Sequence, residues 1–186
     1  TSEGAELALG FSAHGLVDKD LVLRKGGMMP GDRLILTKAL GTGTLFAADM
    51  QQKAKGRWIQ DALKSMLVSN RVAASLVYEH GATACTDITG FGLLGHLVEM
   101  IRPSEVDVDI HMDRLPILDG AEETVEMGIL SSLQPANIRL RRAIRNREDA
   151  VQSNRFPLIF DPQTSGGLLA SVPAAQADTC VEALHA

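Results

Sequence analysis

Apolar residues recur at helical spacing in several stretches of the chain. The clearest stretch begins at Arg57 and continues to Leu67 with apolar side chains three or four positions apart, which predicts a helix with one buried face. A second run, from Leu93 to Ile101, predicts a helix that Pro103 ends. Further helices are predicted from about Leu45, from a cap at Asn70 to Gly81, from a cap at Asp119 through Met127, and over residues 174–186.

Other stretches have the patterns that are typical of β-strands. Residues 106–112 alternate strictly between apolar and polar, which predicts a strand with one face in water. Residues 33–37 are mostly apolar and predict a buried strand. Further strands are predicted over residues 5–17, paired with 21–23, over 82–85, over 156–160 and over 168–172.

The most distinctive stretch runs from Cys85 to His96, where a short strand leads to Asp87, three glycines and an apolar helix. Glycines let the backbone approach a ligand closely, and the first amides of a helix attract anions. A carboxylate is also a preferred ligand of Mg²⁺, which completes its shell with water and phosphate oxygens. The stretch therefore predicts a metal or phosphate site, and a plain turn with an aspartate cap is the alternative.

The glycines of this stretch also fit the dinucleotide fingerprint, at Gly90, Gly92 and Gly95. That fingerprint needs an acidic residue about 20 positions further on to hold the ribose. Asp107 and Asp109 come too early for this role. The acid that precedes the glycines suits a metal ion better than a ribose hydroxyl.

Several other polar groups have both a functional and a structural interpretation. Gly41-Thr42-Gly43 could cradle a phosphate with Lys38 as counter-charge, or form a turn. His96 is a candidate metal ligand or proton shuttle, or a packed structural histidine. Asp107 and Asp109 are candidate metal ligands, or solvated residues of a strand. Arg139, Arg142 and Arg145 could contact a phosphate or an acidic partner, or form a solvated face. The 161–167 loop could line a cleft, or form a hairpin connection.

Composition narrows the class of protein. With 186 residues and 45% hydrophobic content, the chain is long enough for one domain with a substantial core. The net charge of -5 argues against a nucleic-acid partner. No apolar run reaches the length of a membrane span, and no signal segment opens the chain, so a soluble cytoplasmic protein is expected. The two cysteines, Cys85 and Cys180, fit neither a disulfide framework nor a zinc site.

Three segments of the chain resemble selenophosphate synthetase, also called selenide, water dikinase. They are Gly31 to Gly43, Thr86 to His96, and Phe160 to Leu169 with its Asp-Pro-Gln-Thr-Ser-Gly-Gly sequence. The resemblance covers almost the whole chain and points to the carboxy-terminal half of such an enzyme. It implies an α+β fold with a mixed, largely antiparallel sheet flanked by helices, similar to the carboxy-terminal domain of aminoimidazole ribonucleotide synthetase.

The resemblance also implies a domain organisation. Residues 1–16 would be the end of the junction with a missing amino-terminal ATP-binding domain, entering the first strand. Residues 17–186 would be the remainder of a single carboxy-terminal domain. The chain starts at Thr1 and not at a methionine, so we expect it to be a fragment or a processed product. The implied partners are the amino-terminal domain and a second copy in a homodimer.

The function implied by the resemblance is the conversion of ATP, selenide and water to selenophosphate, AMP and phosphate, with Mg²⁺ as cofactor. Asp87 matches the metal-binding aspartate of the family motif, and Thr1 matches the last residue of a segment that contacts ATP. The family's nucleophile and its other metal ligands precede this part of the sequence, so we expect the chain alone to be inactive. A hydrogenase-maturation or thiamine-phosphate kinase relative, or a non-catalytic packing or regulatory module, are the alternatives.

Overall fold

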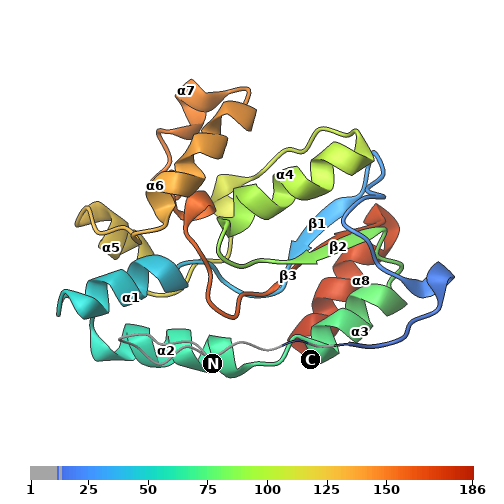
Figure 1. Ribbon diagram of the computed structural model, residues 1–186, viewed down its shortest axis with the longest axis horizontal. Coiled ribbons are helices and arrows are strands. Elements are labelled where there is room, and N and C mark those ends of the chain that lie inside the picture. Colours follow the sequence, from blue (N-terminus) through green and yellow to red (C-terminus); the bar gives the residue numbers. More distant parts are fainter. Residues whose placement is uncertain (1–11, 13) are drawn as a thin grey trace.

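The computed structural model describes residues 12 and 14–186 as a three-stranded antiparallel sheet covered by helices (Figure 1). The strands are β1 (Arg33–Leu36), β2 (Ala84–Asp87) and β3 (Leu168–Val172), in the order β1-β3-β2. In the register, Ile35 and Cys85 both lie opposite Ala170. Because β3 runs antiparallel to both neighbours, the ends of β1 and β2 lie beside the start of β3.

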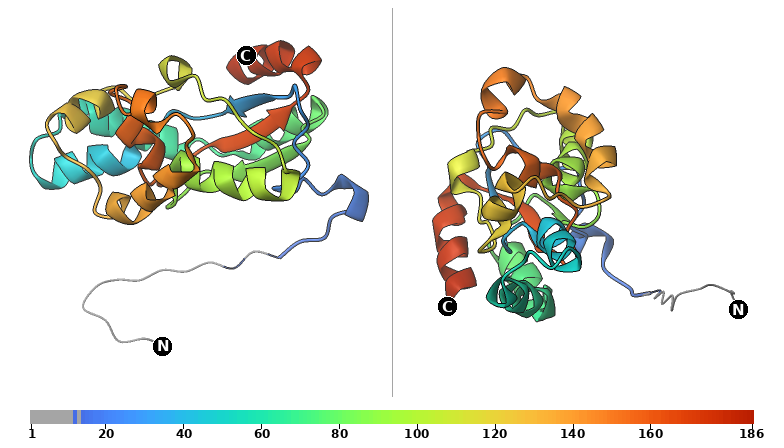
Figure 2. Two further views of the ribbon diagram at one scale, coloured as in Figure 1. Left: turned by 90° about the horizontal axis from the view of Figure 1, so that it is seen from above. Right: turned by 90° about the vertical axis from the view of Figure 1, so that its left-hand side faces the viewer.

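Eight α-helices and four short 3₁₀ helices surround the sheet in the described part of the chain. The sheet lies between α4 on one face and α3 with α8 on the other, and α1, α2 and α5 gather at one end (Figures 1 and 2). The α-helices are α1 (Thr42–Met50), α2 (Gly56–Leu67), α3 (Arg71–Glu79), α4 (Gly92–Ser104), α5 (Ala121–Glu126), α6 (Gln134–Asn137), α7 (Arg147–Ala150) and α8 (Ala174–His185). The 3₁₀ helices are η1 (Lys19–Leu21), η2 (Met112–Arg114), η3 (Ile138–Ala143) and η4 (Phe156–Phe160). None of the described helices is long and apolar enough to cross a membrane.

The alternation of β3 divides the core in two. Leu169 belongs to the cluster on the α4 face, with Leu93, Leu97 and Phe160. Ala170 and Val172 belong to the opposite cluster, which α3 and α8 cover. Successive residues of a strand point to opposite faces, so one short strand supports both halves of the core. The predicted α+β class, the strands at 33–37, 82–85 and 168–172 and most of the helices are confirmed.

The strand predicted over residues 156–160 is wrong, because these residues form the 3₁₀ helix η4. Pro157 stands in the first turn, where its missing N–H costs nothing. A helical turn also lets the apolar side chains reach two clusters: Leu158 packs against α1 and α2, whereas Phe156 and Phe160 pack on the α4 side. A short apolar run could not distinguish this arrangement from a buried strand.

The strand predicted over residues 106–112 is also wrong, since these residues form no ladder. Exposure nevertheless alternates as predicted, with Val106, Val108 and Ile110 half-buried and Asp107 and Asp109 exposed. The segment has the sequence pattern of a strand but no hydrogen-bonded neighbour among the described residues. The sequence pattern therefore predicted correctly which side chains are half-buried and which are exposed, but it predicted hydrogen bonds to a neighbouring strand that are absent from the described structure.

Other predicted boundaries shift. The strand predicted over 21–23 is absent, because η1 occupies Lys19–Leu21, and most of the partner predicted over 5–17 lies outside the described residues. Pro103 does not end α4, which continues to Ser104 before Glu105 turns left-handed. Asp119 is not the cap of α5, because Gly120 takes that position with φ +84°.

The cluster of α1, α2 and α5 explains why Gly120 stands there. A Cβ on Gly120 would lie 2.1 Å from the ring of Trp58, which is 2% exposed. Trp58 packs with Leu45, Ala62 and Leu158 in this cluster. The start of α5 can therefore approach the indole of Trp58 this closely only because Gly120 has no side chain.

Replacing Gly120 by alanine should destabilise the chain more than the same change at Gly128. Both glycines have positive φ, but nothing lies within 4 Å of a Cβ at Gly128. Gly128→Ala should cost about 1 kcal/mol from backbone strain, whereas Gly120→Ala should cost roughly 2 kcal/mol more because the indole must move. Urea unfolding of the two variants measures the difference, and equal losses would show that Trp58 does not set the packing here.

Candidate active site

The three segments that carry the family resemblance meet at one end of the sheet. Lys38 to Thr44 follow β1, the turn of residues 87–92 (the Asp87 turn) follows β2, and residues 161–167 (the 161–167 loop) precede β3. They meet because β3 is central and antiparallel to both of its neighbours. Segments more than a hundred residues apart in sequence thus become one site.

The 161–167 loop fills the amino terminus of α1. The side-chain Oε1 of Gln163 accepts hydrogen bonds from Gly41 N at 3.1 Å and from Thr42 N at 3.3 Å. Oδ2 of Asp161 accepts one from Gly43 N at 3.0 Å. The loop therefore satisfies helix amides that would otherwise lack partners. The structure supports the turn interpretation of the Gly-x-Gly sequence, because its amides are not free for a phosphate.

Lys38 and Asn70 hold the other side of the 161–167 loop. Nζ of Lys38 donates to the carbonyls of Val68 at 2.7 Å and Ser165 at 3.0 Å, and Asn70 donates to the Gly166 carbonyl at 3.0 Å. Asn70 occupies the predicted cap position of α3, but its side chain makes no capping bond. Ser165 has φ +48°, a conformation that side chains disfavour. Lys38 therefore holds a strained loop and not a phosphate, and partial burial lowers its pKa.

The Asp87 turn rests on the 161–167 loop. Ile88 N donates to the Gly167 carbonyl at 2.8 Å, and Gln163 N donates to the Thr89 carbonyl at 3.0 Å. Gly92 has φ +70°, and a Cβ there would lie 2.8 Å from the backbone of Phe160. Glycine is therefore required at Gly92 for both its conformation and its close contact.

His96 has a structural role in this turn. It is 5% exposed, and its Nε2 accepts a hydrogen bond from the backbone N–H of Thr89 at 3.1 Å. Because that N–H can only donate, Nε2 is the unprotonated nitrogen and the proton is on Nδ1. Nδ1 lies 3.5 Å from Oε2 of Glu99. The lone pair that would bind a metal is thus already used, and the structural interpretation is favoured.

Asn137 is a second support for the Asp87 turn, and it was missed in the sequence. Its Nδ2 donates to the carbonyls of Gly90 at 2.8 Å and of Phe160 at 3.0 Å. It is 6% exposed, at the end of α6. Nothing in the sequence pointed to this role, because Asn137 only precedes the arginine-rich stretch, which begins with η3.

The side chain of Asp87 is exposed, and its carboxylate makes no hydrogen bond or ion pair with the described residues. A carboxylate held at the end of a strand and left without a partner has free oxygens for a hard cation. Asp87 does not belong to a cluster of metal ligands in the described structure. Within residues 12 and 14–186, no group of three or more histidine, cysteine, aspartate or glutamate residues could hold a metal ion. The Asp87 carboxylate thus fits Mg²⁺ as one ligand, and the rest of the coordination shell would have to come from other groups.

The remaining candidates lie elsewhere. Asp107 pairs with Arg145 at 2.7 Å on the surface, and Asp109 lies exposed on the same segment. Arg139 and Arg142 are exposed on η3. Thr1 lies outside the described residues. Burial and the nearby Asp87 raise the pKa of Cys85 to about 11, so it is a protonated thiol at neutral pH and a poor nucleophile.

Asp161 is fully buried, and its Oδ1 has no hydrogen-bond partner among the described residues. Burial raises the pKa of this carboxyl to about 7, against the bonds from Gln163 and Gly43, which lower it. Sequence reasoning placed Asp161 in a polar loop and gave no sign that it would be enclosed. Only the packing of the loop against α1 makes it a buried acid.

The contribution of Asp161 to the stability of the chain should fall as the pH rises from about 4 to about 7. The folded chain keeps the Asp161 proton up to a pKa of about 7, whereas the unfolded chain releases it near 3.8. The stabilisation from the protonated Asp161 is fully present below pH 3.8 and is lost as the pH rises to about 7. The free energy of unfolding lost over this range is on the order of a few kcal/mol. Asp161→Asn keeps an acceptor for Gly43 N and should flatten this part of the profile. Urea unfolding at several pH values tests this, and identical slopes for both proteins would contradict it.

Comparison with known proteins agrees with this geometry. The family model described as AIR synthase related protein, C-terminal domain, matches residues 29–186. A selenide, water dikinase of Geobacter metallireducens is 39% identical over 187 residues, which cover 96% of this chain and 52% of the relative. One of Caldanaerobacter subterraneus is 37% identical over 188 residues, covering 100% of this chain and 54% of the relative. The chain thus spans about half the length of the curated relatives it matches.

Solved structures show the same fold at lower identity. A hydrogenase maturation protein HypE has a TM-score of 0.62 at 17% identity and covers 91% of this chain and 44% of its own. The thiamine-monophosphate kinase of Stenotrophomonas maltophilia has a TM-score of 0.57 at 21% identity, with 89% and 47% covered. HypE has also been solved in complex with ATP, at a TM-score of 0.59, 16% identity and 91% and 42% coverage. The family model, the relatives and the shared fold lead to one assignment: the chain belongs to the family of AIR synthase related proteins and is its C-terminal domain.

Proposed function

We propose that the chain is the carboxy-terminal half of a selenide, water dikinase, which converts ATP, selenide and water to selenophosphate, AMP and phosphate. The observation that carries this proposal is the exposed, unpartnered Asp87 at the point where the three resembling segments meet. Relatives named selenide, water dikinase match nearly the whole chain at 34–41% identity. The two enzyme types seen among the solved structures share the fold at 21% identity or less and give no reason to prefer their chemistry.

Asp87 would supply one carboxylate oxygen to Mg²⁺. When bound, Mg²⁺ neutralises phosphate charge, which is the main requirement of phosphoryl transfer. The chain's own residues fix where that carboxylate stands: the 161–167 loop supports Ile88, and Asn137 holds the Gly90 carbonyl. A single carboxylate is too few for a triphosphate with its metal ions, so the other ligands would come from an amino-terminal domain.

The proposal includes the partners expected from the sequence. These are the amino-terminal domain, with ATP and selenide bound between the two halves, and a second copy in a cytoplasmic homodimer. Thr1 as an ATP contact and the division at residue 16 remain predictions. The chain alone is proposed to be inactive, because the nucleophile and the remaining ligands are expected in the other domain.

Asp87→Asn in the full-length protein should abolish most selenophosphate formation. We expect kcat to fall about 100-fold or more, because charge neutralisation at the phosphates is lost. The free energy of unfolding should change by less than about 0.5 kcal/mol, since the side chain is exposed and unpartnered. The measurement is selenophosphate produced from ATP and selenide at several Mg²⁺ concentrations, beside urea unfolding.

Asp109→Asn is the matched control, because Asp109 is also exposed but belongs neither to the Asp87 turn nor to the 161–167 loop. It should retain full activity. A non-catalytic packing module would instead tolerate both changes equally, and that outcome would reject the proposed metal site. Selenophosphate formation by the 186-residue chain without the rest of the protein would reject its dependence on the other half.

Asn137→Ala should weaken Mg²⁺ use as well as stability. Losing both hydrogen bonds leaves the Gly90 and Phe160 carbonyls unpaired, at a cost of about 1–3 kcal/mol. Because the Asp87 turn would lose a support, the Mg²⁺ concentration for half-maximal activity should rise roughly 10-fold or more. Titration of activity with Mg²⁺ in the full-length protein measures this.

Gln134→Ala separates positioning from stability in this experiment. Gln134 is 2% exposed in the same helix and donates to the Pro157 carbonyl at 2.7 Å, away from the Asp87 turn. It should lose stability to a similar degree and keep the Mg²⁺ dependence of the wild type. Equal shifts in both variants would show that Asn137 acts through overall stability alone.

A further inference from the structure

The outer edge of β1 has no bonded neighbour in the described part of the chain. Thr37 N donates to the Leu168 carbonyl, and antiparallel strands alternate between bonded and non-bonded pairs. Ile35 therefore bonds to β3, whereas the N–H and C=O groups of Leu34 and Leu36 point away from it. The opposite edge of the sheet differs, because Cys85 N donates to the Arg24 carbonyl there.

A second unpaired backbone faces this edge. No N–H or C=O group of residues 106–110 makes a hydrogen bond with another described residue. The exposure of the segment alternates as in a strand with one wet face. Buried or half-buried backbone groups without partners are rare in native proteins. Two bare edges therefore lie on either side of one space.

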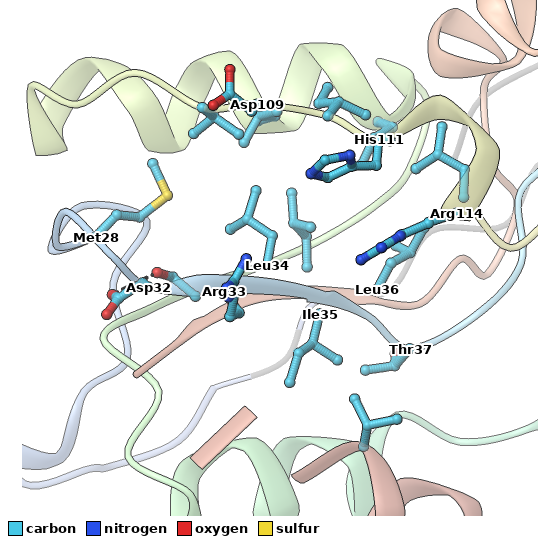
Figure 3. Close-up of a pocket in the computed structure, with 18 of the residues that line it drawn as sticks. Met28, Asp32, Arg33, Leu34, Ile35, Leu36, Thr37, Asp109, His111 and Arg114 are labelled. Atoms are coloured by element: carbon cyan, nitrogen blue, oxygen red, sulfur yellow. Dashed lines mark hydrogen bonds between the residues drawn. The ribbon is translucent and has the colours of Figure 1, made fainter. Parts of the chain in front are cut away.

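That space is a groove of about 850 Å³. Figure 3 shows β1 with Leu34 and Leu36 on one side, and the segment with Asp109 and His111 on the other. Apolar side chains from several elements line the groove, and they include Leu34 and Leu36 of β1, Val106, Val108 and Ile110 of the facing segment, and Val181 and Leu184 of α8. Apolar walls with free backbone groups are the features by which a sheet accepts an added strand.

The direction of an added strand follows from the ends of the groove. Leu40 forms a parallel bridge with Ile117, through bonds of 2.9 Å to Pro116 O and from Leu118 N. Figure 3 shows the same direction nearer the groove, because Asp109 to His111 run the same way as Asp32 to Thr37, so the 106–112 segment runs parallel to β1. A strand between them that is antiparallel to both would bond to each edge and would make the 106–112 segment a strand, as its sequence predicts.

We propose that the groove is filled by one extended strand of the same polypeptide from outside residues 1–186, antiparallel to β1. The sheet would then have five strands. The matched relatives are about twice as long as the part aligned with this chain, and a full-length protein of that size would have the chain length to supply the strand. A second copy's β1 is a poorer occupant, because it is recessed behind its own 106–112 segment in the same way. The proposal is independent of the chemistry at Asp87.

Hydrogen exchange in the perdeuterated full-length protein, followed by NMR, tests the pairing. The amides of Leu34 and Leu36 should exchange about 100-fold or more slowly than in an unstructured chain, as core strands do. The amide of Ile35 is the internal control, because it faces β3 and is protected in either case. Fast exchange at Leu34 and Leu36 beside a protected Ile35 would overturn the proposal.

Amide-to-amide NOE contacts from Leu34 and Leu36 identify the occupant in the same sample. The expected contacts are to residues of the same polypeptide outside 1–186. Contacts to residues 106–112 would show that this segment moves onto β1 directly. Contacts between differently labelled copies would assign the groove to a second copy, and either result would overturn the proposed occupant.

Discussion

The candidate site depends on hydrogen bonds between the 161–167 loop and the start of α1. The carboxamide oxygen of Gln163 and the carboxyl of Asp161 satisfy the first amides of the helix from a distance of about 120 residues in sequence. An unsatisfied helix end would be costly in a buried position, so this contact fixes both elements together. The loop then offers its other backbone groups to the Asp87 turn.

This arrangement separates two roles that the sequence presented together. Asp161, Gln163, Asn137 and His96 are polar, but they are buried and occupied with holding backbone groups. Asp87 is the carboxylate in this region that is left free at the surface. Fixed polar groups behind a free ligand are what a preorganised metal site requires. The charge and the shape of the site therefore come from different residues.

The pattern of apolar residues predicted correctly those helices and strands whose structure depends on which side chains are buried. The amphipathic helices α2 and α8 were confirmed because one face of each is buried, and the strand β3 was confirmed because both of its faces are buried. The wrong predictions are those for segments whose structure depends on the neighbours that they contact or hydrogen-bond. Residues 156–160 have the same apolar run whether they form a strand or a 3₁₀ helix, and residues 106–112 lack the neighbour that their pattern requires. Asp87 stood out because acid and glycines are adjacent in sequence, whereas Asn137 contacts the turn only through the fold.

The glycines of the Asp87 turn and the 161–167 loop have a consequence for evolution. A side chain at Gly92 would collide with the Phe160 backbone, and one at Gly166 would lie 2.1 Å from the Ile88 carbonyl oxygen. Selection at these positions acts on packing, and it would persist in a descendant that had lost catalysis. Much of the family signature would thus survive in an inactive paralogue, so the identity of the residue at Asp87 is a better guide to retained chemistry than the glycines around it.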